Sequence, residues 1–313
     1  MKKSEIYLIT ALVLIIYSIY PLLTGDTYLL RVLILVHIFA ILAASLDIIV
    51  GYTGQLTAGH TAVWGWGAFT TAWMILWFGA NPLLAVLVGA LFGALLGLGI
   101  GILCLRFRYL LLTLVTFALL VLSYALARQF TDITGGELGL HGITPITKNP
   151  ILSFYITFGA LLITVVSLLV LGRSRIGLRM KSIKEDEVAA ETIGINTVRY
   201  KVLANVIGSF YAGLAGGLYT TYTTSVGASI FFLDHLLRLI LMWGIGGGGT
   251  IIGPVIGAYT VMLLSEYLRF IEELRLILLG IIMILIMRFF PAGLHGMISL
   301  TLMKTPIRGG KVK

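Results

Sequence analysis

The stretch RVLILVHIFAILAASLDIIVGYTGQLTAGH, residues 31–60, decides the fold class. From residue 32 to residue 50 it is apolar except for His37, Ser45 and Asp47. At a rise of about 1.5 Å per residue, about 20 such residues form a helix that crosses the hydrocarbon core of a bilayer. The glycines and threonines that follow favour an irregular segment. The stretch therefore predicts a transmembrane helix followed by a break.

The composition of the whole chain leads to the same class. Hydrophobic residues make up 59% of the 313 positions, and charged residues make up 11%. Soluble domains contain about 45–50% apolar residues even with glycine counted, and about 25% charged residues. A globule cannot bury so large an apolar excess, so most of the surface must face lipid. The sequence predicts an all-α polytopic integral membrane protein, with a single transmembrane domain over residues 1–313.

About ten transmembrane helices are expected from the apolar runs. They cover residues 6–23, 28–50, 56–78, 82–105, 109–127, 151–171, 203–222, 233–248, 251–268 and 274–290. The third run is rich in glycine and threonine, and only GIGGGGTIIGP separates the eighth from the ninth. Either region is therefore a candidate for a broken or re-entrant helix. The two glycine-rich stretches lie early and late in the chain, which suits an inverted repeat, although their match is degenerate.

The distribution of Lys and Arg orients these spans, because basic residues concentrate in cytoplasmic loops of membrane proteins. With Lys2 and Lys3 in the cytoplasm, ten spans place both termini and sixteen of the 22 basic residues inside. The connection 172–201 is then cytoplasmic, and the connection 128–150 is extracytoplasmic. The basic residues lie in short loops rather than on one soluble face, so the net charge of +9 indicates membrane topology and not a nucleic-acid partner.

The connection 172–201 contains the most charged stretch of the chain, KSIKEDEVAAETIGIN, at residues 181–196. Ser182 and Glu185 have the spacing of a capping box, and Gly194 is typical of the position just past a helix end. Together they predict one helix of about eleven residues. Asn196 or Thr197 can cap a second helix.

The expected helix has an acidic first turn, formed by Glu185, Asp186 and Glu187, which complements the helix dipole. Ile183, Glu187, Ala190 and Gly194 recur at helical spacing, with Ala189 and Ile193 alongside, and predict a small apolar face. Two interpretations are open. The helix is either a solvated connector or a docking helix whose small face a partner protein can approach closely.

The sequence has no pattern that points to catalysis or to a resident cofactor. Gly244, Gly246 and Gly249 satisfy G-x-G-x-x-G, but they lack the preceding soluble strand that a dinucleotide site requires. No G-x-x-x-x-G-K-[ST] sequence occurs, so the chain cannot bind ATP through a P-loop. The five histidines and the single cysteine, Cys104, lack the spacing of a metal site. We therefore expect neither an enzyme nor a metal centre.

Residues near the predicted membrane interior are candidates for a pathway or its gate, because polar groups are costly to bury there. The polar candidates are Asp47, Gln55, His60 and Asp234, and the glycine candidates are Gly51, Gly246 and Gly249. Each polar residue also has an alternative role. Near the end of a span, it can reach water or cap a broken helix.

Several motifs resemble those of permease subunits from branched-chain amino acid ABC importers. Residues 183–219, IKEDEVAAETIGINTVRYKVLANVIGSFYAGLAGGLY, resemble the cytoplasmic loop and following span of that family. Residues 51–69, GYTGQLTAGHTAVWGWGAF, resemble its signature. Further matches are TGGELGLHGI, GIGGGGTIIGPVIGA and FPAGLHGMI, at residues 134–143, 244–258 and 290–298. The motifs follow the order of the family and are closer to its M-type subunit than to its H-type subunit.

The resemblance implies an ATP-driven importer of leucine, isoleucine and valine in the plasma membrane of a prokaryote. Its implied partners are a homologous H-type permease, two cytoplasmic ABC ATPase subunits that bind ATP and Mg²⁺, an extracytoplasmic binding protein and membrane lipid. Other amino acids, urea or short amides remain open as substrates. The alternative from another class is an ion-coupled secondary transporter that uses Asp47 and Asp234.

The resemblance also implies a role for the charged connection. Import permeases carry a degenerate E-A-A-x-x-x-G pattern in the loop that couples them to the ATPase. Here Ala189, Ala190 and Gly194 fit this pattern, and the acidic position is displaced to Glu187. Residues 172–201 are thus expected to be the coupling loop.

Overall fold

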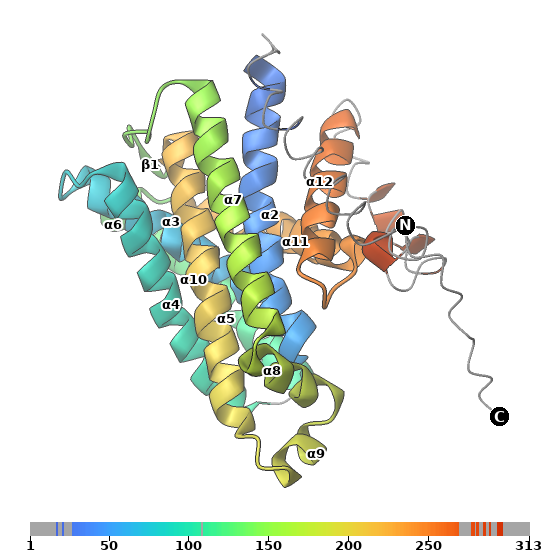
Figure 1. The fold of residues 1–313 in the computed structure, drawn as a ribbon. Coiled ribbons are helices and arrows are strands. Elements are labelled where there is room, and N and C mark those ends of the chain that lie inside the picture. Colours follow the sequence, from blue (N-terminus) through green and yellow to red (C-terminus); the bar gives the residue numbers. More distant parts are fainter. Residues whose placement is uncertain are drawn as a thin grey trace.

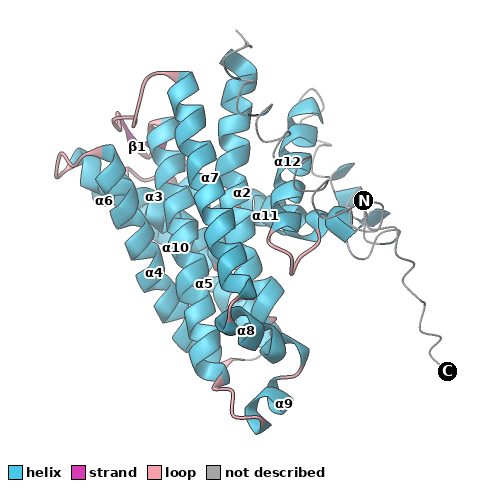
Figure 2. Cartoon of the chain, in the orientation of Figure 1, coloured by secondary structure: helices cyan, strands magenta, loops and turns pink. Residues whose placement is uncertain are grey.

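The computed structural model describes residues 27–107 and 109–268, together with Tyr17, Pro21 and short pieces between residues 277 and 296. The expected spans at 6–23 and 274–290, and both termini, lie outside the continuously described part. Nearly all described residues are in helices, as Figures 1 and 2 show. The predicted all-α class is confirmed.

Five helices are long and apolar enough to cross a membrane. They are α2 (Thr27–Thr53), α4 (Pro82–Arg106), α5 (Tyr109–Gln129), α7 (Pro150–Arg173) and α10 (Thr197–Thr223). Two of them begin in the same way. Asn81 and Asn149 each accept a hydrogen bond at 2.9 Å from the backbone N–H two residues on, and a proline stands between. Asparagine is a favoured N-cap and proline suits the first turn, so local chemistry sets where α4 and α7 begin.

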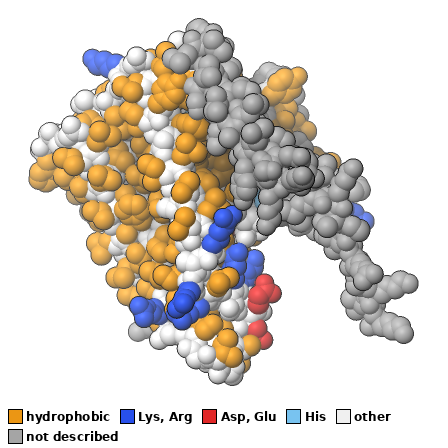
Figure 3. All heavy atoms as spheres, viewed as in Figure 1, with side chains coloured by type: hydrophobic (Ala, Val, Ile, Leu, Met, Phe, Trp, Pro, Cys, Tyr) orange, Lys and Arg blue, Asp and Glu red, His pale blue; other side chains and the backbone are white. Residues whose placement is uncertain are grey.

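Glycines on α4 and α10 bring these two helices into close contact. A Cβ added at Gly93 would lie 2.5 Å from the carbonyl oxygen of Ser209, and one added at Gly213 would lie 2.5 Å from that of Gly89. The backbones therefore touch, as is typical of helices packed in membranes. On the outer faces of α4, α5 and α7, large apolar side chains are exposed, and Figure 3 shows hydrophobic side chains over much of the visible surface. These faces suit contact with lipid.

The two long connections lie at opposite ends of the bundle (Figure 1). One end carries α6 (Thr131–Thr134) and β1 (Leu140–His141), which pairs antiparallel with β2 (Ser225–Val226) just before the 3₁₀ helix η1 (Ala228–Phe231). The other end carries α8 (Arg175–Glu185) and α9 (Glu187–Thr192). We call them the β1–β2 end and the α8–α9 end.

The connection between α2 and α3 (His60–Leu76) runs back into the bundle. His60 Nε2 lies 2.9 Å from Ser45 Oγ, although Ser45 is about 12 Å along α2 from its last residue. Residues 54–59 are not helical, and α5 satisfies part of their backbone, since Thr113 Oγ1 donates to the carbonyl oxygen of Leu56 at 3.1 Å. Non-helical backbone at such depth needs partners of this kind. The third expected span is therefore broken at its start.

α11 (Leu233–Gly246) and α12 (Ile252–Tyr267) form a hairpin. The arms have 14 and 16 residues, fewer than the roughly 20 that a full crossing needs. The hairpin starts after β2 and returns to the first turn of α2, where Tyr28 donates a hydrogen bond to Glu266. The expected spans at 233–248 and 251–268 are therefore the two arms of one broken, re-entrant hairpin.

Candidate functional site

The α8–α9 segment, residues 174–197, consists of two helices and not one. Ser174 caps α8, because its hydroxyl accepts hydrogen bonds from the N–H groups of Ile176 and Gly177 at 3.2 and 3.4 Å. Asp186 then interrupts the helix with extended backbone, at φ −156° and ψ 110°. Its carboxylate caps α9 by accepting a hydrogen bond from Ala189 N at 3.0 Å.

The predicted capping box at Ser182 and Glu185 is therefore wrong. Ser182 lies inside α8, where its hydroxyl donates to the carbonyl oxygen of Leu178 at 3.0 Å, and Glu185 is the last residue of that helix. The reason is the competition between Asp186 and the helix for backbone N–H groups. A carboxylate is stabilised at a helix N-terminus, so α9 begins after Asp186.

The far end of α9 follows the prediction. Gly194 has a φ of +83°, a conformation that glycine adopts without steric cost. Ile195 N donates to Ala190 O, and Gly194 N donates to Glu191 O, each at 3.0 Å, which is the Schellman pattern. Asn196 then caps α10 through its side chain, as expected.

The residues of the predicted small face point in two directions. Ile183 and Ala190 are only 3% and 2% exposed, and they pack in one cluster with Tyr52 of α2. Ala189 and Gly194 are exposed. The predicted face is therefore divided between the body of the protein and its surface.

The exposed apolar side chains of α9 are Val188 and Ile193, at 68% and 74%. Val188 was not among the predicted residues, although an apolar side chain in so charged a stretch was a visible signal. With Ala189 and Gly194 they form an apolar surface, which we call the α9 patch. An exposed apolar patch with polar surroundings is typical of a protein interaction site.

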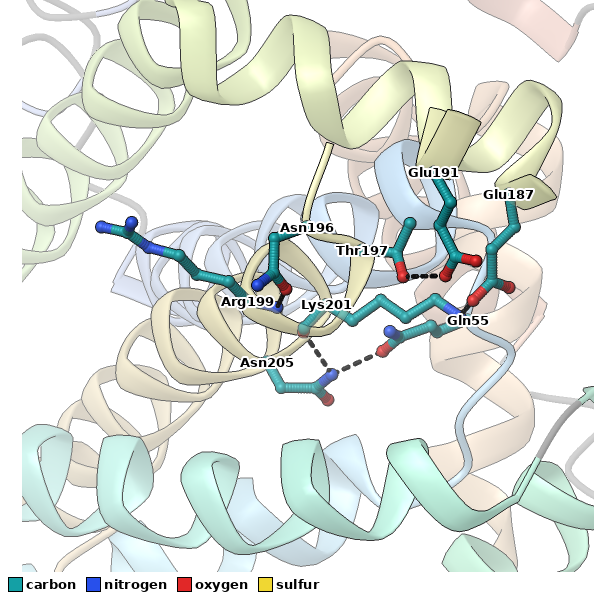
Figure 4. A network of polar contacts seen from close by, with 8 residues as sticks. All are labelled: Gln55, Glu187, Glu191, Asn196, Thr197, Arg199, Lys201 and Asn205. Atoms are coloured by element: carbon teal, nitrogen blue, oxygen red, sulfur yellow. Dashed lines mark hydrogen bonds and ion pairs between the residues drawn. The ribbon is translucent and has the colours of Figure 1, made fainter. Parts of the chain in front are cut away.

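A polar network ties α9 to α10 (Figure 4). Lys201 Nζ lies 2.5 Å from Glu187 Oε1, and the two side chains are 12% and 23% exposed. Beside this ion pair, Thr197 Oγ1 donates to Glu191 Oε1 at 2.7 Å. A partly buried pair of this kind costs free energy when one partner is removed, because the other charge then stays unpaired. α9 and the first turn of α10 are thus held as one unit.

The same network reaches the connection after α2 (Figure 4). Asn205 Nδ2 donates to the carbonyl oxygen of Lys201 at 3.0 Å and to Gln55 Oε1 at 2.5 Å. Gln55 is 5% exposed, and its Nε2 atom has no hydrogen-bond partner within the part of the chain that the structure describes. The broken segment at 54–59 is therefore joined to the α8–α9 segment through α10.

A cavity of about 280 Å³ opens between the connection after α2 and the α8–α9 segment. Its lining includes the carboxylates of Glu185, Asp186, Glu187 and Glu191, the ammonium groups of Lys184 and Lys201, and Gln55. The structure thus brings one pathway candidate, Gln55, together with four residues predicted for coupling, which are Ile183, Glu185, Asp186 and Glu187.

Asp47 holds the tip of the α11–α12 hairpin. It is fully buried, and its Oδ1 accepts hydrogen bonds from Trp243 Nε1 at 2.8 Å and from Gly249 N at 2.6 Å. Its Oδ2 accepts a third from Ile251 N at 2.8 Å. The carboxylate therefore serves as a cap for the break between two helices. Because Ile251 has a φ of +62°, which a β-branched residue rarely adopts, these bonds also hold a strained backbone.

Gly51 and Lys184 also lie next to the hairpin tip. A Cβ at Gly51 would lie 2.1 Å from Asp47 Oδ1 and 2.7 Å from Gly249 N, so only glycine fits. A Cβ at Gly249 would lie 3.5 Å from Lys184 Nζ. α8 therefore reaches the hairpin tip with a cationic side chain, next to the position where α2 meets the same tip.

Comparison with known proteins identifies the family. The model of the family described as "Branched-chain amino acid transport system / permease component" matches residues 28–287. The chain belongs to this family. The permease is 25% identical over 323 residues to LivM, the high-affinity branched-chain amino acid permease protein of Escherichia coli strain K12, covering 93% of this chain and 75% of LivM. No solved structure matches the permease.

Two further relatives are similar to the permease. LivM of Salmonella typhimurium is 24% identical over 342 residues, covering 99% of the permease and 79% of that protein. The guanosine ABC transporter permease protein NupQ of Bacillus subtilis is 31% identical over only 68 residues, 22% of the permease and 21% of NupQ. The match to LivM therefore extends over the whole fold, whereas the match to NupQ is local.

Of the remaining pathway candidates of the permease, Gly246 adjoins the hairpin tip, and His60 and Asp234 make their contacts elsewhere. His60 is 2% exposed and bonds to Ser45, as described above, while its Nδ1 has no partner among the described residues. Asp234 begins α11 and forms an ion pair with Arg238. Gly246 packs on the other arm, since a Cβ there would lie 1.9 Å from Gly253 O. The seven candidates therefore divide among four places: the hairpin tip with Asp47, Gly51, Gly246 and Gly249, the cavity with Gln55, the contact of His60 with Ser45, and the ion pair of Asp234.

Proposed function

We propose that the chain is the membrane-spanning permease subunit of an ATP-driven ABC importer for leucine, isoleucine and valine. The match of the family model over residues 28–287 carries this proposal. Five helices long enough to span a membrane support it, as does the similarity to two LivM proteins. The permease itself carries out no chemical reaction, and its partner ATPase subunits bind ATP and Mg²⁺.

The α8–α9 segment is the surface that an ATPase subunit contacts. The α9 patch offers apolar side chains, and the carboxylates of Glu185 and Asp186 are exposed beside it. A partner that moves α9 also moves α10, because Glu187 and Lys201 form an ion pair between them. The motion continues to Gln55 through Asn205. This chain of contacts would transmit ATP-driven closure of the ATPase to the transmembrane helices.

The orientation follows from this role. The α8–α9 end faces the cytoplasm of a prokaryote, and the β1–β2 end faces outward, where an extracytoplasmic binding protein delivers the substrate. A homologous H-type permease forms the other half of the channel, and two ATPase subunits bind from the cytoplasm. Lipid covers the exposed apolar faces of α4, α5 and α7.

Reconstitution tests the proposal. The permease, its neighbouring permease, the ATPase subunits and the binding protein are placed in liposomes, and uptake of radiolabelled leucine is measured. We expect uptake that requires ATP and the binding protein. Uptake driven by a proton or sodium gradient without ATP would identify an ion-coupled transporter instead, and uptake of urea, short amides or other amino acids in place of leucine would correct the substrate.

A further inference from the structure

The first turn of α11 packs against the middle of α2, although Phe232 and Leu233 at its start are 49% and 50% exposed. The ring of His235, in its first turn, stacks on Phe39 with centroids 6.1 Å apart. Phe39 lies near the middle of α2, so the start of α11 is level with the middle of that membrane-length helix. Helices that begin at this depth expose their positive ends to whatever occupies the pathway.

An ion pair occupies this position. Asp234 Oδ2 lies 2.7 Å from Arg238 Nη2, one turn later on α11, and the two side chains are 31% and 15% exposed. Each of the two side chains also has a second polar atom that is buried. Asp234 Oδ1 and Arg238 Nε are shielded from solvent and find no hydrogen-bond partner among the residues that the structure describes.

His235, which follows Asp234 in the chain, belongs to a cluster of aromatic rings. Trp64 is fully buried, and its ring centroid lies 5.1 Å from those of both His235 and Tyr219. The ring centroids of Phe39 and Trp64 lie 5.6 Å apart. Trp64 Nε1 and His235 Nδ1 also lack partners within the described ranges. Buried polar atoms are nearly always hydrogen-bonded in folded proteins, so these four atoms on Trp64 and the first two turns of α11 leave hydrogen-bonding capacity for a ligand.

We propose that Asp234 and Arg238 form a binding site for the zwitterionic backbone of an amino acid in the membrane interior, with Trp64, Phe39 and Tyr219 contacting its side chain. The proposal rests on the function proposed above. A free amino acid carries an ammonium and a carboxylate on one carbon, and these match the carboxylate of Asp234 and the guanidinium of Arg238.

Charge balance favours the binding of a zwitterion at this ion pair. An isolated charge is costly in the bilayer interior, and a zwitterion carries two. When the amino acid enters, each partner of the ion pair exchanges one contact for the opposite charge of the substrate, so no charge is left unpaired. The apolar side chain of the substrate meets aromatic faces, which supply a large apolar contact area. The site recognises the features common to amino acids, and the binding protein selects among them.

A purely structural role is the competing explanation, because an aspartate in the first turn also stabilises the helix dipole. Ligands that lack one of the two charges distinguish the binding role from the purely structural role. L-leucine carries both charges, leucinamide lacks the carboxylate, and 4-methyl-2-oxopentanoate lacks the ammonium. We would measure the binding of all three to the assembled transporter in lipid nanodiscs, without binding protein.

For the unmodified transporter, we expect leucine to bind at least tenfold more tightly than either analogue. In Asp234→Asn, leucine should bind no better than 4-methyl-2-oxopentanoate, because the partner of the ammonium is lost. In Arg238→Gln, leucine should bind no better than leucinamide. Arg128→Gln is the control, since it removes an exposed ion pair with Glu137 at the β1–β2 end and should bind all three ligands as the unmodified transporter does.

The proposal is overturned if both variants keep the preference for leucine, or if each variant loses affinity for all three ligands equally. Size-exclusion chromatography and the thermal unfolding of each variant establish that it is assembled before binding is measured. A failure of the function proposed above would be seen in a different measurement. In that case the unmodified transporter shows no ATP-driven leucine uptake, whatever the variants bind.

Discussion

Asp47 Oδ1 on α2 lies 2.6 Å from the backbone nitrogen of Gly249, 202 positions later in the chain. This carboxylate accepts three hydrogen bonds from the hairpin tip and is fully buried. A glycine-rich break in a membrane needs its backbone N–H groups satisfied, because lipid offers no acceptor. The contact therefore explains how an irregular tip is held in a fixed position against a long helix.

Removing this acceptor should destabilise the permease. Asp47→Ala leaves three buried donors unpaired, and each costs about 1–3 kcal/mol. We expect a lower unfolding temperature for the purified chain, and a smaller decrease for Asp47→Asn, which keeps one acceptor oxygen. Asp132→Asn, at an exposed position of α6, is the control. An Asp47→Ala variant that unfolds at the temperature of the control would show that the tip does not depend on this residue.

The same contact predicts that Gly51 tolerates no side chain. In Gly51→Ala, the new methyl group would lie 2.1 Å from Asp47 Oδ1 and 2.7 Å from Gly249 N, so the Asp47 side chain and the hairpin tip must both move. We expect a loss of stability of about 1–3 kcal/mol, typical of overpacking. Gly159→Ala on α7 is the matched control, because a Cβ there meets nothing within 4 Å and should be neutral or stabilising. Equal unfolding temperatures for the two variants would contradict the prediction.

The ion pair between Glu187 and Lys201 should be needed for coupling. Either Glu187→Lys or Lys201→Glu places two like charges in a partly buried site and should separate α9 from α10. We expect less leucine transported per ATP hydrolysed in each single variant, by roughly fivefold for a coupling energy of about 1 kcal/mol. The double exchange restores opposite charges and should recover most of the loss. If the double variant transports no better than the single ones, the pair does not link the two helices.

The α9 patch should bind an ATPase subunit. Replacing Val188 and Ile193 by serine removes two exposed apolar side chains without touching the buried face of α9. The expected result is loss of the ATPase subunits during co-purification, with unchanged amounts of permease in the membrane. Leu138→Ser is the control, because Leu138 is 84% exposed at the β1–β2 end. Retention of the ATPase by the double variant would place the docking surface elsewhere.

The two ends of the bundle should face opposite compartments. The single native cysteine, Cys104, is replaced by alanine, and one cysteine is introduced at either Ile193 or Leu138. A membrane-impermeant thiol reagent should label position 138 in intact cells, and position 193 only after the membrane is opened. Labelling of position 193 from outside would invert the orientation and remove the basis for ATPase docking at α9.

Much of the local structure was predictable from short stretches of sequence. The cap at Asn196 and the turn at Gly194 depend on the conformational preferences of single residues, and both appear where expected. The glycine-rich stretches predicted breaks for the same reason. The division of residues 174–192 into two helices was not predictable, because Ser174, Ser182 and Asp186 are all good caps and only the folded backbone selects among them.

By itself, the sequence determined that the chain crosses a membrane through helices and that two of its segments are irregular, because hydrophobic length and glycine content are properties of neighbouring residues. Only the tertiary structure decided what these segments contact. Asp47 meets Gly249, Gln55 meets Asn205, and Trp64 meets His235, each pair joined across more than a hundred positions. Polar groups in a membrane must find partners within the protein, and those partners come from helices that are distant in sequence.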